Sequence, residues 1–115
     1  MKVIKRDGSE APFEKSRIWN AVAKADAAGR ERGLEDALST VDIGEIANNV
    51  QRRCEELNRA VNIEEIQDFV EDELVSFGHH RLMRLYSRYR IERERRRQEN
   101  TTDAKILALL ERQNE

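Results

Sequence analysis

The sequence predicts a mostly α-helical domain: a four-helix core capped by a short N-terminal β-hairpin sheet, with a C-terminal helix added. Several segments repeat apolar residues every three or four positions, which is typical of amphipathic helices. An Asp-Gly pair near the N-terminus lies between two short extended segments, as in tight hairpins. The 115 residues are 38% hydrophobic, a content that suits helices with polar outer faces. A chain of this length can build one modest core.

The hairpin is expected from residues 1–5 and 10–13, which flank Asp7-Gly8. Pro12 suits an edge strand, because it has no N–H to donate within a sheet. So small a hairpin is not stable alone, and we expect it to lie against the helices.

The first helix is expected from about Glu14 to Ala28, and its buried face holds Ile18, Val22 and Ala25. Glycine and charge in residues 29–33 should end it.

The second helix is expected to begin at Thr40 as the N-cap, with Asp42 in its first turn. Its apolar stripe is the cleanest in the chain and consists of Ile43, Ile46, Val50, Cys54 and Leu57. Asn62 should open the third helix, with Glu65 three residues later completing a capping box. The buried face of that helix is expected to hold Ile63, Ile66, Phe69, Val70 and Leu74.

The fourth helix should follow Gly78, running from about His79 into an arginine-rich segment. It is expected to bury Leu82, Leu85, Tyr86 and Tyr89. Residues 98–103 resemble a polar joint, after which Asp103 could cap a last short helix carrying Ile106, Leu107, Leu109 and Leu110. The chain is therefore divided into a domain of residues 1–97 and a joint with a following segment, residues 98–115.

Charge is strongly segregated along the chain, although the net charge is only −2. Residues 81–97 hold eight arginines against Glu92 and Glu94, whereas residues 63–74 hold six acidic residues and no base. Basic and acidic surfaces should coexist. The acidic set is expected to be a solvated face or to dock on a basic surface of another subunit.

Several function classes are excluded by what the sequence lacks. No apolar run approaches the length of a membrane span, so a soluble, cytoplasmic protein without a membrane partner is expected. The single cysteine, Cys54, cannot form an internal disulfide and lies on a buried stripe, so it should be a core thiol. No arrangement of residues suggests catalysis, and His79 and His80 lack further ligands for a metal. We therefore expect neither an enzyme nor a metal site.

The hairpin turn and the start of the first helix carry the chemistry that suggests a ligand. Lys5 and Arg6 can make charge-assisted contacts to phosphate, and both side chains are expected to be exposed. Gly8 allows close approach of the backbone, and the free N–H groups of the helix start favour an anion. Arg17 can add a cation one turn later. From the turn residues alone, an ordinary hairpin with solvated Lys and Arg is the alternative.

A longer pattern resembles the ATP-cone, a regulatory domain best known at the N-terminus of ribonucleotide reductases. The pattern is an apolar residue, then Lys5-Arg6-Asp7-Gly8, then Phe13-Glu14, then Arg17-Ile18 and a run of alanines. The resemblance covers residues 3–90 and includes the aromatic and arginine residues that end the fourth helix, Tyr86-Ser87-Arg88-Tyr89-Arg90.

This resemblance implies a nucleotide site. Phe13 and Glu14 fall where the family holds adenine, Arg17 replaces the family's usual lysine, and Thr40 falls where a threonine commonly meets phosphate. Gly44 departs from the family, because some relatives have a histidine there. The implied nucleotide-binding residues are Val3, Lys5, Arg6, Asp7, Gly8, Phe13, Glu14, Arg17, Thr40, Arg88 and Arg90.

The resemblance also implies the function: an allosteric domain that binds ATP or dATP, with Mg²⁺, and sets the overall activity of an anaerobic ribonucleotide reductase. ATP would permit activity and dATP inhibit it, by changing oligomerisation or domain packing. The partners would be the catalytic domain of the same chain and other cones. Residues 102–111 resemble the segment that leads to that catalytic domain, so we expect an excised N-terminal domain.

The alternative is a small helical nucleic-acid-binding regulator that uses the arginine-rich helix 81–97. Tyr86 and Tyr89 are interleaved with the arginines there, and RNA often stacks on aromatic side chains. If the chain is an ATP-cone, no nucleic-acid partner is expected.

Overall fold

The computed structural model describes the backbone of residues 1–34 and 38–113 and the side chains of residues 1–34 and 38–97. It confirms a mostly α-helical domain with a small N-terminal sheet. The elements in chain order are β1 (Lys2–Ile4), β2 (Glu10–Pro12), α1 (Lys15–Glu31), α2 (Thr40–Glu56), β3 (Val61–Asn62), α3 (Ile63–Ser76) and α4 (His80–Gln113).

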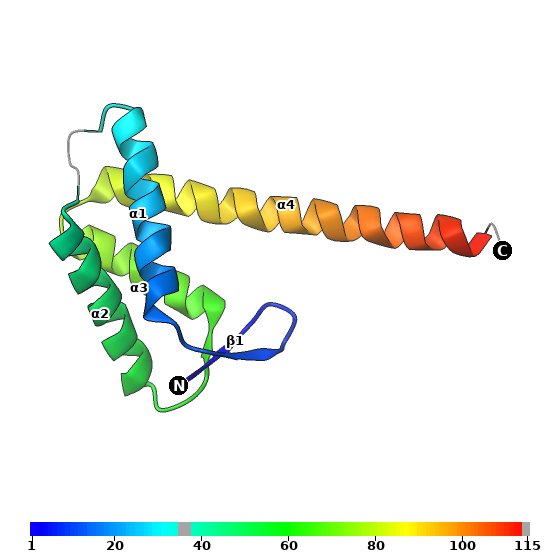
Figure 1. The fold of residues 1–115 in the computed structure, drawn as a ribbon, viewed down its shortest axis with the longest axis horizontal. Coiled ribbons are helices and arrows are strands. Elements are labelled where there is room, and N and C mark those ends of the chain that lie inside the picture. Colours follow the sequence, from blue (N-terminus) through cyan, green and yellow to red (C-terminus); the bar gives the residue numbers. More distant parts are fainter. Residues whose placement is uncertain (35–37, 114–115) are drawn as a thin grey trace.

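The helices form a bundle in which α2 packs against α1 and α3, while α4 packs against both α1 and α3. Figure 1 shows α1 and α2 running in opposite directions, with the sheet below the lower end of α1. The far half of α4 extends well beyond the other helices (Figure 1).

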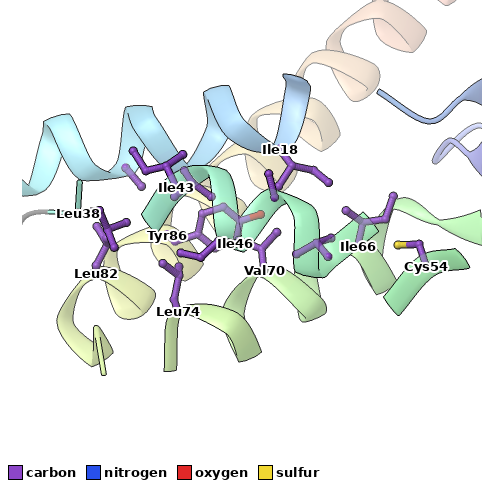
Figure 2. Close-up of a cluster of buried hydrophobic side chains, with 14 of the residues drawn as sticks. Ile18, Leu38, Ile43, Ile46, Cys54, Ile66, Val70, Leu74, Leu82 and Tyr86 are labelled. Atoms are coloured by element: carbon purple, nitrogen blue, oxygen red, sulfur yellow. The ribbon is translucent and has the colours of Figure 1, made fainter. Parts of the chain in front are cut away.

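The hydrophobic core lies between the four helices, and most of the apolar residues predicted to be buried belong to it. Figure 2 shows Ile43 and Ile46 of α2 facing Tyr86, with Val70 and Leu74 of α3 beneath them. Ile46, Val50, Cys54 and Leu74 are each 0% exposed. Cys54 is therefore a core thiol as predicted, and burial raises its pKa to about 11. The apolar environment disfavours the thiolate, which is the nucleophilic form.

The sheet contains one strand more than the predicted hairpin. Its order is β2-β1-β3, with β1 antiparallel to β2 and parallel to β3. Pro12 lies on the edge strand β2, as predicted. The additional strand was not predicted because it has only two residues and leads straight into α3. It matters for function because it fixes the hairpin at the start of α3.

The helix starts agree with the sequence at α3 and differ at α2. Asn62 and Glu65 form the predicted capping box. Thr40, however, is the first residue of α2 and not its N-cap. Ser39 is the N-cap: its hydroxyl accepts from the Asp42 N–H, and the Asp42 carboxylate accepts from the Ser39 N–H.

The predicted joint at residues 98–103 is wrong, because α4 continues through it to Gln113. Polarity alone does not end a helix, and residues 79–113 contain neither proline nor glycine. The side chains of Asp103 and the following leucines lie outside those described. Tyr89 was also predicted to be buried, but it is 38% exposed.

No helix within residues 1–34 and 38–113 is both long enough and apolar enough to span a membrane.

Candidate nucleotide site at the hairpin and α4

The hairpin turn is held by its own backbone and by Asp7. The Lys5 N–H donates to the Ser9 carbonyl at 2.8 Å, and the Gly8 N–H donates to the Lys5 carbonyl at 3.0 Å. Gly8 has φ of 86°, a left-handed conformation that glycine adopts without strain. The Asp7 carboxylate accepts from the Ser9 N–H and hydroxyl, and these hydrogen bonds lower its pKa. Asp7 therefore shapes the turn and stays ionised.

Lys5 and Arg6 follow each other in the turn but have different surroundings. Lys5 is exposed, as predicted. Arg6 was also predicted to be exposed, but only 21% of its side chain is accessible. Its guanidinium lies against α4, where it forms an ion pair with Glu94. Arg6 is less exposed than Lys5 because β1 pairs with β3 beside the start of α3, and the turn that follows β1 meets the middle of α4 at Glu94.

Arg90 clamps α4 to α3. Its guanidinium donates to Asp68 at 2.7 Å, to Glu71 at 3.1 Å and to the backbone carbonyl of Glu64 at 3.3 Å. Partial burial disfavours its charge, but the hydrogen bonds to Asp68 and Glu71 outweigh this effect and raise its pKa. Arg90 is thus a structural ion-pair partner in this structure as well as a candidate ligand.

A cavity of about 310 Å³ lies between the turn, α3 and α4. Two predicted ligands, Arg6 and Arg90, line it together with Glu64, Gln67, Ile91, Glu94 and Arg95. The Nε and Nη1 atoms of Arg6 and the Oε1 atom of Gln67 are buried there without a hydrogen-bond partner. Buried polar atoms of this kind are normally satisfied by protein, water or ligand. The cavity therefore offers guanidinium groups and unused polar atoms to a polar ligand.

The start of α1 carries a second group of predicted residues. Glu14 occupies the N-cap position but makes no side-chain capping hydrogen bond. Instead its carboxylate accepts from Arg17 Nε at 2.9 Å, and both side chains are exposed. Phe13 packs partly buried against the core, and Val3 is 8% exposed. Val3 and Phe13 are therefore supports of the hairpin base, whereas Glu14 and Arg17 remain accessible.

The remaining predicted ligands do not line the cavity. Arg88 is exposed on α4. Thr40 is exposed as the first residue of α2, and Figure 1 shows that the start of α2 lies away from the hairpin. Lys15 of α1 donates to Asn48 of α2, and Thr40 precedes Asn48 by eight residues, or about 12 Å of helix. The structure therefore brings Arg6 and Arg90 together, keeps Glu14 with Arg17, and places Thr40 apart from the turn.

Sequence reasoning missed the cavity residues on α3 and α4, above all Gln67 and Glu94. One signal was present: Glu94 follows Arg90 by four residues, so the two share a helix face. Nothing local indicated that the turn would reach that face, because the contact joins residues 88 positions apart.

The acidic stretch of α3 is not simply a solvated face. Besides its contacts with Arg90, it meets Arg53 of α2 through Asp72 at 3.3 Å and Glu73 at 3.8 Å. The Arg59 guanidinium binds Glu65 through both carboxylate oxygens and lowers the pKa of that carboxyl. The acidic and basic segments therefore meet within this chain. Among the residues with described side chains, no group of three metal-ligating residues is present.

The fold and site describe a small helical module with a charged cavity under an N-terminal hairpin, and comparison with known proteins places it in a family. The ATP cone domain family matches residues 1–95, so the chain belongs to the ATP-cone family. The predicted family is thereby confirmed.

Similar proteins are ribonucleotide reductases. The chain is 36% identical to an anaerobic ribonucleoside-triphosphate reductase of Haemophilus influenzae over 114 residues, which are 97% of this chain and 15% of the reductase. It is 32% identical to the anaerobic enzyme of Salmonella typhimurium, with the same coverage. It is also 32% identical to a ribonucleoside-diphosphate reductase subunit alpha of Treponema pallidum, covering 84% of this chain and 12% of that subunit. The chain thus spans about 15% of the anaerobic reductases it matches, and these 115 residues are an ATP cone without a reductase catalytic part.

Proposed function

We propose that this ATP cone binds ATP or dATP at the hairpin and regulates the overall activity of a ribonucleotide reductase in the cytoplasm. The observation that carries the proposal is the convergence of Arg6 and Arg90 on one cavity, beside the exposed Lys5, in a chain of this family. Guanidinium groups can bind two phosphate oxygens at once, and an ammonium supplies a compact charge next to them. Mg²⁺ would be shared between the phosphates and water.

The adenosine end of the nucleotide is assigned to the start of α1. Glu14 and Arg17 are exposed there, and only two residues separate the end of β2 from the start of α1. Phe13 is partly buried and packs against the core next to these residues. Thr40 and Arg88 are secondary candidates, because neither lines the cavity.

Regulation requires that the nucleotide prefer one arrangement of the protein over another. A ligand with equal affinity for two states shifts nothing, however tightly it binds. We propose that ATP permits activity and dATP suppresses it, by changing how cones pack with each other or with a catalytic domain of the same chain. The two nucleotides differ by one hydroxyl, so the discriminating free energy is about 0.5–1.5 kcal/mol per site, the net value of one hydrogen bond.

Calorimetric titration with ATP, dATP and GTP tests the binding proposal. We expect both adenine nucleotides to bind and GTP to bind more weakly. Light scattering coupled to size exclusion, with each nucleotide at saturation, tests the packing proposal. A mass that is the same with ATP, with dATP and without nucleotide would contradict self-association while leaving nucleotide binding intact.

The structure gives little support to the nucleic-acid alternative. Tyr86 is 9% exposed and belongs to the core, so it cannot stack on a base, and Arg90 is already paired with two acids. A nucleic-acid binder would lose affinity steeply with salt, since many phosphates are involved. Titration with a single-stranded RNA at two salt concentrations separates it from a mononucleotide-binding cone.

A further inference from the structure

The ion pair between Arg6 and Glu94 joins the hairpin turn to α4 across the cavity. Arg6 is one of the residues proposed to bind phosphate, and its guanidinium pairs with a carboxylate of the same chain. We propose that Glu94 is an internal competitor for the nucleotide: its carboxylate and a phosphate group compete for the Arg6 guanidinium, so that binding of the phosphate displaces Glu94. This inference rests on the proposed nucleotide site.

The surroundings of Arg6 explain why a counter-ion is needed there. Burial, followed by the charges of Arg97, Arg90 and Arg93, lowers the pKa of Arg6, and Glu64 only partly offsets this. A half-buried cation among other cations is costly unless an anion lies close to it. Arg90 forms ion pairs with Asp68 and Glu71, whereas Arg6 forms its ion pair with Glu94.

A phosphate would meet the same need more completely. The Nε and Nη1 atoms of Arg6 are buried without a hydrogen-bond partner, so the guanidinium, although paired in charge with Glu94, has donor capacity that a phosphate could use. A phosphate brings more negative charge and more acceptor oxygens than one carboxylate. It cannot share the guanidinium with Glu94 without like-charge repulsion, so binding of one disfavours the other.

The position of Glu94 would couple this competition to the way in which α4 is held against the rest of the bundle. Glu94 lies on α4, four residues beyond Arg90, which holds α4 to α3. When nucleotide takes Arg6, the contact between the turn and α4 is lost while the contact between Arg90 and α3 can persist. The part of α4 beyond Arg90 is then held less tightly, and this is the part that extends away from the bundle (Figure 1).

The test compares Glu94→Gln with Glu92→Gln in calorimetric titrations with ATP. Glu92 lies two residues away on the same helix and is exposed, so its variant removes the same charge without removing the contact with Arg6. We expect Glu94→Gln to bind ATP about three- to five-fold more tightly than the wild type, the ratio that corresponds to one ion-pair contact. Glu92→Gln should change affinity less than about two-fold, as a general field effect.

Two further variants make the result specific. In an Arg6→Gln background, Glu94→Gln should give no more gain than Glu92→Gln, because the competitor has lost its target. Glu94→Asp keeps the charge on a shorter side chain and should fall between the wild type and Glu94→Gln, which covers the case in which the glutamine variant folds poorly.

The outcomes separate this inference from the proposed function. If the wild type binds ATP but the two glutamine variants behave alike, Glu94 is not a competitor, and the nucleotide site stands. If none of the proteins binds ATP, the proposed function fails and the inference fails with it. A gain for Glu94→Gln that persists in the Arg6→Gln background would also overturn the inference.

Discussion

The core of the bundle and the charged region at the hairpin depend on different physical interactions. The helical core is filled with apolar side chains that are almost completely buried, such as Val22, Ile46 and Leu74. The cavity between the hairpin turn and α4 is lined mostly by charged side chains, several of which pair with residues far away in the sequence. Core packing is non-directional and tolerant, whereas a charged cavity depends on particular partners. Stability should therefore depend on the first region and nucleotide binding on the second.

The largest effect is expected from emptying the core. Leu74→Ala removes a side chain that is 0% exposed and should lower the free energy of unfolding by about 2–5 kcal/mol. Chemical denaturation measures this, with Val75→Ala as the control, since Val75 is 38% exposed on the same helix. An equal loss of stability in the two variants would contradict the claim that stability depends on the buried core.

Lys5→Ala tests the charged region between the hairpin turn and α4. Lys5 is exposed, so the fold should be unchanged, while nucleotide affinity should fall by about 1.5–3 kcal/mol, as for a hydrogen bond to a charged group. Lys2→Ala is the matched control, because Lys2 is an exposed lysine of the same hairpin that pairs with Glu10. Calorimetry with ATP gives the affinities and circular dichroism checks the fold. Equal affinities for Lys5→Ala and the wild type would remove Lys5 from the site.

Asp26 is an exception within the apolar core, because it is a buried carboxylate, and its replacement tests whether a polar group can also contribute to the stability of that region. It is 7% exposed and accepts from the Leu38 N–H and from Arg30 Nε, each at 2.9 Å. Asp26→Ala leaves a buried N–H without an acceptor and should cost about 1–3 kcal/mol of stability. Glu31→Ala, at an exposed position on α1, should be close to neutral in the same thermal melt. A neutral Asp26→Ala would show that this carboxylate does not help to join α1 to α2.

The smallest effect is a pH dependence at the start of α3. Hydrogen bonds from Arg59 and the Asn62 N–H lower the pKa of Glu65 below its ordinary 4.5. A carboxyl group whose pKa is lowered by folding stabilises the folded state above its ordinary pKa, and this contribution is lost as the pH falls through the lowered value. The melting temperature should therefore drop below about pH 4.5 more for the wild type than for Glu65→Gln. Parallel pH profiles of the two proteins would contradict this assignment.

The core could be predicted from the sequence because helical burial repeats locally, as Ile43, Ile46, Val50 and Cys54 show. Capping boxes are equally local, and Asn62 with Glu65 was recognised. The Arg6–Glu94 contact could not be predicted, because it depends on β3, a strand of two residues with no periodic signal. The continuity of α4 was missed for a different reason: a polar segment without proline or glycine has no local feature that distinguishes a joint from an exposed helix. The family pattern identified candidate ligands, but their distribution over several elements required the fold.

The central claim is that nucleotide binds to the charged region at the hairpin and not elsewhere on the bundle. The most direct measurement is an NMR titration of the ¹⁵N-labelled chain with ATP, following each backbone amide. We predict the largest shift changes at Lys5, Arg6, Gly8 and Arg17, with a smaller change at Glu94. Little change is expected at Arg53 of α2, which pairs with Asp72 and Glu73 of α3 and does not line the cavity. Saturable changes centred on Arg53 and the middle of α2, with the hairpin amides unmoved, would contradict the account.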